Sequence, residues 1–169
     1  MDSKAIFDPD KLEETKLFRI DFSMARKYHQ GFFTPRNPQK YKGDPNKIVY
    51  RSSWEAACFK KLDEHPDVIQ WASEEQAILY TNPFDGKPHR YFPDIIVWKR
   101  EGKEIKVYMI EIKPHAQTQP PKEGKSKKRY LTEVQTWGIN SAKWAAARRH
   151  CEKRGWTFQI LSEKHLGLF

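Results

Sequence analysis

The chain has 169 residues, of which 38% are hydrophobic and 31% are charged, and its net charge is +9. This length suits one domain, and the six Trp, seven Tyr and ten Phe residues supply enough apolar volume for a core. No apolar run approaches the roughly 20 residues that span a bilayer, and the N-terminus carries no apolar signal region. These features exclude a membrane protein and predict a soluble, intracellular one.

The positive charge is concentrated in one part of the chain. From Lys99 to Arg154 there are 15 Lys or Arg residues and 6 Asp or Glu residues, whereas the rest of the chain has 16 of each. A one-sided positive field favours a polyanionic partner, nucleic acid before an anionic membrane surface. The alternative is a charged face that only keeps the protein soluble.

The two cysteines do not indicate a metal site. Cys58 and Cys151 lie far apart, and the sequence has no CxxC motif and no Cys/His cluster. A zinc site is therefore not expected. We predict that both are buried small apolar residues in a reducing compartment.

The N-terminal part of the chain has little regular patterning. Residues 1–36 are predicted to be an extension, with a short helix around Leu12–Ile20, and residues 37–169 to form one domain. The segment 31–47 is rich in Pro, Gly and Asn and predicts a loop. The first well-defined helix is expected from Ser52, because Ser52 and Glu55 form a capping-box pattern, and Pro66 ends it.

Strands are expected in the middle of the chain. The segment 68–80 predicts one or two strands with a kink at Glu74 and Glu75, followed by a turn in NPFDGKPH. The apolar runs RYFPDIIVW and IKVYMIEIK flank KREGKE, which is typical of a hairpin. Because both runs are apolar on both faces, these two strands should be central and covered on both sides.

The C-terminal part is expected to contain one loop, one helix and one strand. Residues 115–129 predict a basic loop, residues 130–154 a long helix closed by Gly155, and WTFQILSE a last strand. The order of elements predicts one α/β domain.

Charged residues interrupt the two apolar strands of the hairpin. Asp94 lies between Pro93 and Ile95, and Glu111 and Lys113 are separated only by Ile112. Because side chains alternate along a strand, Glu111 and Lys113 should point to the same face. Burying such groups is costly unless each is paired or bound to a metal. The pattern therefore predicts a functional site.

The three groups match the chemistry of a metal-dependent hydrolase. Asp94 and Glu111 supply hard oxygen ligands for Mg²⁺, for which Mn²⁺ is expected to substitute, and the carbonyl of Ile112 is a further candidate ligand. Such a cation polarises a phosphate oxygen and activates water, and Lys113 would orient or deprotonate the water and stabilise negative charge. We therefore predict phosphodiester hydrolysis at a PD-(D/E)xK site.

Each of these residues also has a simpler interpretation. Glu111 and Lys113 alone would be a strand-end ion pair, but a PD dipeptide seventeen residues before ExK, with a hairpin between, favours catalysis. Glu55 either closes the capping box or helps to hold the metal, and the residues alone leave both open. Glu74 and Glu75 are rivals, of which at most one should point inward.

Basic residues near the predicted site are candidate DNA contacts. Individually each is more simply a solvated surface charge, but together they suit a cleft that binds the DNA backbone. The candidates are Lys125, Lys127, Lys128 and Arg129 in the Lys122–Arg129 loop, and Lys143 and Arg148 on the following helix.

Several motifs, in order, resemble the head-completion nucleases of T-even-type tailed phages. They are NPQKYKGDPNKIVYRSSWE, HPDVIQWASEE, HRYFPDIIVW and MIEIKP, with a weaker match through WGINSAKWAAAR and FQILSEK. The pattern is more distantly similar to the nuclease subunit of heteromeric transposases. The resemblance covers most of the chain but not its first thirty-odd residues.

The resemblance implies a fold, a site and a role. The fold is a restriction-endonuclease-like α/β core, in which helices flank a central mixed sheet. The active-site set is Glu55, Asp94, Glu111 and Lys113. The implied role is to trim packaged DNA so that filled heads join tails, by a virion-associated protein whose partners are DNA and phage head or neck proteins.

Two other functions remain open at this level. One is a structural head–tail joining protein that grips DNA or portal proteins and keeps a vestigial site. The other is a transposase-like nuclease, although the sequence shows no recognition helix of its own. The expected nuclease activity is endonucleolytic, exonucleolytic or both.

Overall fold

The β6–β7 hairpin forms the centre of the fold, which we describe from a computed structural model of residues 30–124 and 126–165. Strand β6 (Ile95–Glu101) and strand β7 (Glu104–Ile112) pair antiparallel around a turn in which Gly102 has a φ of 62°. This positive φ is readily adopted by glycine. The predicted hairpin is confirmed.

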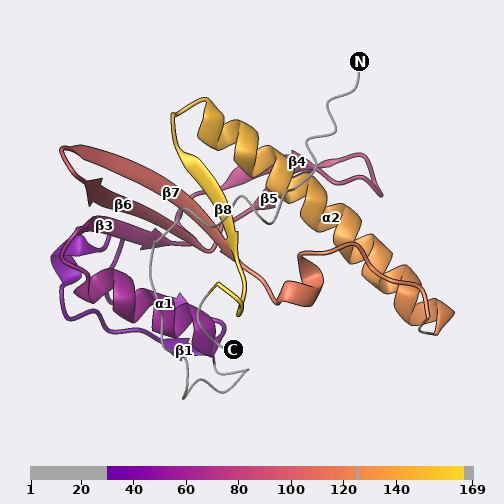
Figure 1. Ribbon diagram of the computed structural model, residues 1–169, viewed down its shortest axis with the longest axis horizontal. Coiled ribbons are helices and arrows are strands. Elements are labelled where there is room, and N and C mark those ends of the chain that lie inside the picture. Colours follow the sequence, from indigo (N-terminus) through magenta and orange to yellow (C-terminus); the bar gives the residue numbers. More distant parts are fainter. Residues whose placement is uncertain (1–29, 125, 166–169) are drawn as a thin grey trace.

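A four-stranded mixed sheet extends from this hairpin on both sides (Figure 1). Strand β3 (Val68–Ser73) pairs antiparallel with β6, and β8 (Thr157–Leu161) pairs parallel with β7. A parallel strand requires a crossover connection, which α2 (Lys127–Glu152) and the short 3-10 helix η3 (His115–Gln117) provide.

The two faces of the sheet are covered by different helices (Figure 1). Helix α1 (Ser53–Glu64) packs through Cys58, Phe59 and Leu62 on the face that carries Trp71 and Val97. On the other face, α2 contributes Ala146, Ala147 and Cys151 to a second core with Ile96 and Met109. The predicted α/β class, a central mixed sheet flanked by helices, is confirmed, and so is the burial of both cysteines.

Two short hairpin-like pairs complete the described chain. Strand β4 (Ile78–Thr81) pairs with β5 (Pro88–Tyr91), and β1 (Gly31–Phe32) pairs with β2 (Val49–Tyr50), with the 3-10 helix η2 (Pro38–Lys40) between β1 and β2. No helix in the described part of the chain is long and apolar enough to cross a membrane.

One predicted strand is wrong. RYFPDIIVW is not continuous, because its first residues belong to β5 and its last ones to β6, in different sheets. Pro93 is buried between them, and proline has no N–H for a sheet ladder. Asp94 therefore precedes β6 and does not lie within a strand.

The start of the long helix also differs from the prediction. Helix α2 begins at Lys127, where Ser126 caps it by accepting a hydrogen bond from the Arg129 N–H at 3.4 Å. Lys127, Lys128 and Arg129 are thus in its first turn and not in the preceding loop. The serine cap is the local signal that explains the earlier start.

The chain before residue 37 also contributes to the folded domain. The ring of Phe33 packs edge-on against Phe59 and Trp71, with ring centroids 5.7 and 5.8 Å away. The buried Asp63 carboxylate accepts hydrogen bonds from the Arg36 N–H at 2.7 Å and the Asn37 N–H at 3.1 Å. For residues 1–29, the predicted N-terminal extension stays a prediction. The helix predicted around residues 12–20 lies outside the described residues.

Candidate active site

The register of the β6–β7 hairpin places Asp94 opposite Glu111. Ile95 pairs with Ile110, so the residue that precedes β6 lies across from the next residue of β7. The Asp94 carboxylate accepts a hydrogen bond from the Ile112 N–H at 2.7 Å. Asp94 is therefore hydrogen-bonded directly to β7, the strand that carries Glu111 and leads into Lys113.

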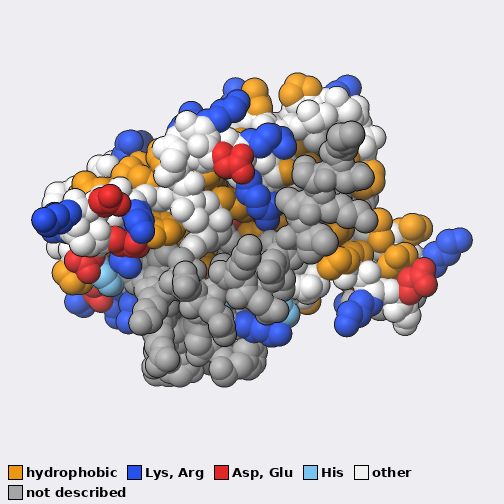
Figure 2. Space-filling view, turned by 45° about the horizontal axis from the view of Figure 1, so that its top comes forward, with side chains coloured by type: hydrophobic (Ala, Val, Ile, Leu, Met, Phe, Trp, Pro, Cys, Tyr) orange, Lys and Arg blue, Asp and Glu red, His pale blue; other side chains and the backbone are white. Residues whose placement is uncertain are grey.

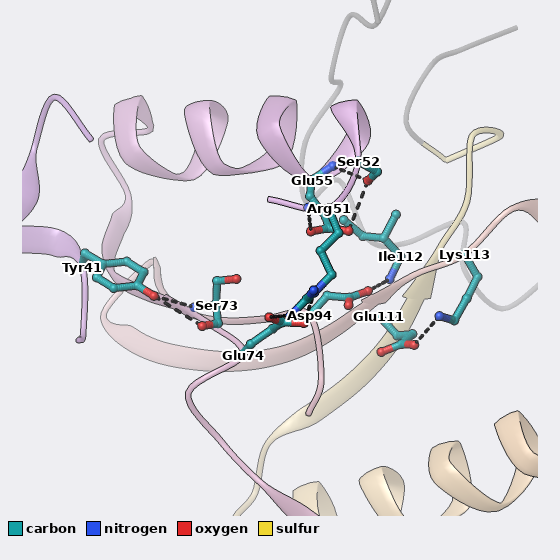
Figure 3. A network of polar contacts seen from close by, with 10 residues as sticks. All are labelled: Tyr41, Arg51, Ser52, Glu55, Ser73, Glu74, Asp94, Glu111, Ile112 and Lys113. Atoms are coloured by element: carbon teal, nitrogen blue, oxygen red, sulfur yellow. Dashed lines mark hydrogen bonds and ion pairs between the residues drawn. The ribbon is translucent and has the colours of Figure 1, made fainter. Parts of the chain in front are cut away.

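Glu111 is buried and has a donor on each carboxylate oxygen. Its side chain is 4% exposed; Lys113 Nζ lies 3.0 Å from Oε1, and the Tyr91 hydroxyl donates to Oε2 at 2.6 Å. Figure 3 shows the ion pair with Lys113. The predicted common direction of Glu111 and Lys113 is confirmed.

The acidic groups are crowded enough to affect one another. Burial, followed by the negative charge of Glu111, raises the pKa of Asp94 well above its ordinary value of 3.8. Burial lowers the pKa of Lys113, but the carboxylates of Glu111 and Asp94 outweigh it, and the net pKa lies above 10.5. Lys113 is therefore an ammonium at neutral pH.

Glu55 closes the capping box of α1, and its carboxylate also lies near the other acids of the site. Its N–H donates to Ser52 Oγ at 3.1 Å, and its carboxylate accepts hydrogen bonds from Ser52 Oγ at 3.2 Å and the Arg51 N–H at 2.8 Å. The cap of α1 is thus confirmed. The charge of Glu55 also contributes to the pKa shifts of Asp94 and Lys113, so its carboxylate belongs to the same electrostatic site (Figure 3).

The side chains of Glu74 and Glu75 point to different partners, as predicted, but for a different reason. They follow β3, and Glu74 has a φ of 52°, the only positive value at a non-glycine residue in the described chain. The Glu74 carboxylate is held by the Arg51 guanidinium, whereas Glu75 accepts a hydrogen bond from the Tyr41 hydroxyl at 3.1 Å. A turn, and not strand alternation, separates them.

Sequence reasoning missed Tyr91 and Arg51. Tyr91 lies on β5, outside the four-stranded sheet, and reaches Glu111 only through the folded topology. Burial and the Glu111 charge raise its pKa, so the hydroxyl is a permanent donor at neutral pH. An aromatic residue in an apolar run and an arginine beside a helix cap carry no local signal for such contacts.

The described residues do not contain a preformed metal cage. No three His, Cys, Asp or Glu side chains within residues 30–124 and 126–165 converge as a metal-binding group. The predicted metal ligands, which are the Asp94 and Glu111 carboxylates and the Ile112 carbonyl, stay a prediction. A carboxylate has about four acceptor positions, so Glu111 keeps free ones beside its two donors.

The predicted DNA contacts fall into separate groups. Lys127, Lys128 and Arg129 are exposed on the end of α2 that projects from the body, and Arg129 pairs with Glu133 at 3.2 Å (Figure 1). Figure 2 likewise shows Lys and Arg side chains at several separate places on the visible face. Lys125 lies outside the described residues.

The two candidates further along α2 are partly buried. Lys143 Nζ lies 5.7 Å from the ring centroids of both Tyr80 and Tyr91, and burial and the Lys113 charge lower its pKa. Arg148 lies over the Phe158 ring at 5.7 Å, and burial lowers its pKa. Lys143 is thus the candidate that the structure brings to the acidic site, whereas Arg148 packs on β8.

Comparison with known proteins finds relatives among nucleases. Residues 65–163 match the family described as TnsA-like endonuclease N terminal, a range that contains Asp94, Glu111 and Lys113 but not Glu55. The head completion nuclease of Enterobacteria phage T4 is 44% identical over 143 residues, which cover 82% of this chain and 93% of that protein. No solved structure matches the chain significantly.

The Tyr91 hydroxyl is expected to stabilise the fold through Glu111. Tyr91→Phe removes a donor from a buried carboxylate and should lower the free energy of unfolding by about 1–3 kcal/mol. Tyr80→Phe is the matched control, because the Tyr80 hydroxyl makes no hydrogen bond within the described residues. Urea denaturation of both variants measures the difference, and equal losses would show that the Glu111 contact is unimportant.

The crowded Asp94 carboxylate is expected to destabilise the metal-free fold. Because its pKa is raised above 3.8, the folded chain holds this proton more tightly than the unfolded chain. The stability that Asp94 contributes is therefore greatest below 3.8 and falls as pH rises through the folded-state pKa.

Asp94→Asn, which keeps an acceptor for the Ile112 N–H, should therefore be more stable than the wild type in EDTA. The gain should be on the order of 1 kcal/mol and larger at about pH 8 than at about pH 5. Urea denaturation at the two pH values measures it. A variant less stable than the wild type at the higher pH would contradict this account.

Proposed function

Since the chain belongs to the family of TnsA-like endonucleases and head completion nucleases, we propose that it is a metal-dependent DNA nuclease that hydrolyses phosphodiester bonds. The observation that supports this most is the hairpin register that brings Asp94, Glu111 and Lys113 together. Two carboxylates and an ammonium, brought together where β6 begins and β7 ends, suit a phosphate group and a divalent cation better than a purely structural role.

Asp94 and Glu111, with the Ile112 carbonyl, would hold Mg²⁺ or Mn²⁺, and Glu55 would assist from α1. Hard oxygen donors of this kind are the ligands these cations prefer. When bound, the cation supplies charge that polarises the phosphate and favours ionisation of water. It would also offset the repulsion between Asp94 and Glu111, which adds to burial in raising the pKa of Asp94.

The protein's own residues orient the reacting groups. Tyr91 holds one oxygen of Glu111, and the Asp94 carboxylate is fixed by the Ile112 N–H. Lys113 is protonated in the absence of a cation and would donate hydrogen bonds to the phosphate as negative charge develops on it. Because these donors already hold the carboxylates in place, the side chains need little rearrangement when the reaction takes place.

Lys143 would bind a phosphate of the substrate beside Lys113. It is a half-buried ammonium that lies against two tyrosine rings and has no carboxylate partner within the described residues. A partly desolvated cation favours an anion, and DNA supplies one at every nucleotide. The exposed basic residues at the start of α2 would add weaker, salt-sensitive contacts.

The relative's name supports a place in phage assembly. We propose that the chain trims packaged DNA during head completion, before heads join tails, and that it associates with head or neck proteins and with the virion. The alternative is a structural joining protein with a vestigial site. The crowding of the Asp94 and Glu111 carboxylates favours the nuclease, because a structural role gives no reason to keep two such groups together.

Cleavage of plasmid and linear DNA tests this proposal. With Mg²⁺ or Mn²⁺ the wild type should cleave, and EDTA should stop it. Asp94→Asn and Lys113→Ala should lose at least about 100-fold in rate, because each removes a group that stabilises the transition state. Lys106→Ala is the matched control, since Lys106 pairs with Glu101 at the other end of the hairpin.

Undiminished cleavage by both site variants would refute the assignment. Absence of cleavage under every condition, together with tight and salt-sensitive DNA binding, would favour the structural alternative. Rescue of head assembly by Asp94→Asn in infected cells would favour that alternative as well.

A further inference from the structure

An arginine and a glutamate form a second ion pair at the edge of the site. Arg51 Nε lies 3.0 Å from Glu74 Oε1, and Arg51 Nη2 lies 3.1 Å from Oε2, so the guanidinium is held at two points. Figure 3 shows this pair beside Asp94 and below Glu55. Neither residue belongs to the PD-(D/E)xK motif.

Both residues are connected to the acids of the site through the backbone. The Arg51 N–H donates to the Glu55 carboxylate at 2.8 Å, and the Glu74 N–H donates to the Asp94 carbonyl at 3.3 Å. The position of the ion pair relative to Glu55 and Asp94 is thus fixed by main-chain contacts. Neither contact uses the side chain of Arg51 or Glu74.

Glu74 occupies a costly backbone conformation. Its φ of 52° lies in the left-handed region, which non-glycine residues adopt rarely. Strained positions of this kind concentrate at ligand-binding and catalytic sites. The turn at the end of β3 directs the Glu74 carboxylate to the Arg51 guanidinium. Asp94 lies beside this ion pair (Figure 3).

The two ion pairs of the site differ in exposure. The side chains of Lys113 and Glu111 are 27% and 4% exposed, whereas those of Arg51 and Glu74 are 60% and 32% exposed. An exposed ion pair is weak in water and exchanges partners at little cost. A guanidinium makes the same two-point contact with a phosphate as with a carboxylate.

We propose that Arg51 is a phosphate-binding residue of the nuclease, and that Glu74 occupies its guanidinium until a DNA backbone phosphate replaces the carboxylate. Arg51 would then bind the DNA backbone on the α1 side of the site, across from Lys143 on α2. This inference rests on the proposed function, because a DNA phosphate reaches Arg51 only when DNA enters the site.

A double-mutant cycle tests the exchange without requiring cleavage. Binding of a fluorescent DNA duplex is measured by anisotropy in EDTA for the wild type, Glu74→Gln, Arg51→Gln and the double variant. Glu74→Gln frees the guanidinium and should tighten binding about two- to fivefold. Arg51→Gln should weaken binding, and in that background Glu74→Gln should give no gain.

Glu75→Gln is the matched control for the lost negative charge. Glu75 is the adjacent residue, and its carboxylate accepts a hydrogen bond from the Tyr41 hydroxyl. Its replacement changes the net charge equally and should change DNA affinity less than Glu74→Gln does. Thermal melting of each variant confirms that it is folded, and Arg51→Lys, which retains the charge but not the two-point geometry, should bind with intermediate affinity.

Two outcomes would overturn the inference. One is a Glu74→Gln variant that binds DNA no more tightly than Glu75→Gln. The other is a gain that persists when Arg51 is replaced, which would show a general charge effect. If the proposed function is wrong, the wild type does not cleave DNA with Mg²⁺. The binding measurements are made in EDTA and do not depend on cleavage, so the two failures are distinguishable.

Discussion

The position of the site depends on one constraint, the register of the β6–β7 hairpin. Because Ile95 pairs with Ile110, Asp94 lies across from Glu111, and its carboxylate reaches the Ile112 N–H at 2.7 Å. A shift by one residue would turn Glu111 and Lys113 to the opposite face of the sheet. The two cores specify the register, because Val97 and Met109 must each face a different helix.

The same register creates an electrostatic cost in the metal-free protein. Burial, followed by the negative charges of Glu111 and Glu55, raises the pKa of Asp94. Lys113 offsets part of this repulsion, because it pairs with Glu111 and its charge lowers the pKa of Asp94. Such an arrangement is expected where a fold gives up stability to keep binding groups charged and close. In the proposed nuclease, a divalent cation would offset the charge of the carboxylates, and DNA phosphates would offset that of Lys113 and Arg51.

The fold was largely predictable, because it follows from local patterns. Two apolar runs around a Gly-bearing turn indicated the hairpin, and Ser52 with Glu55 indicated the start of α1, which their mutual hydrogen bonds confirm. The break at Pro93 was missed, because the apolar run continues through it, and its two halves separate only when β5 pairs with β4. The common direction of Glu111 and Lys113 follows from strand alternation. The contacts of Tyr91, Arg51 and Lys143 join residues distant in sequence, so no local pattern carries them.

The central claim is that Asp94 and Glu111 jointly hold a divalent cation. Anomalous diffraction from crystals soaked in Mn²⁺ tests it most directly, because the signal locates the metal independently of the protein density. The account predicts a peak within about 2.0–2.3 Å of a carboxylate oxygen from each residue, and loss of that peak in Asp94→Asn crystals. A strong Mn²⁺ peak elsewhere, with none between these two carboxylates, would contradict it.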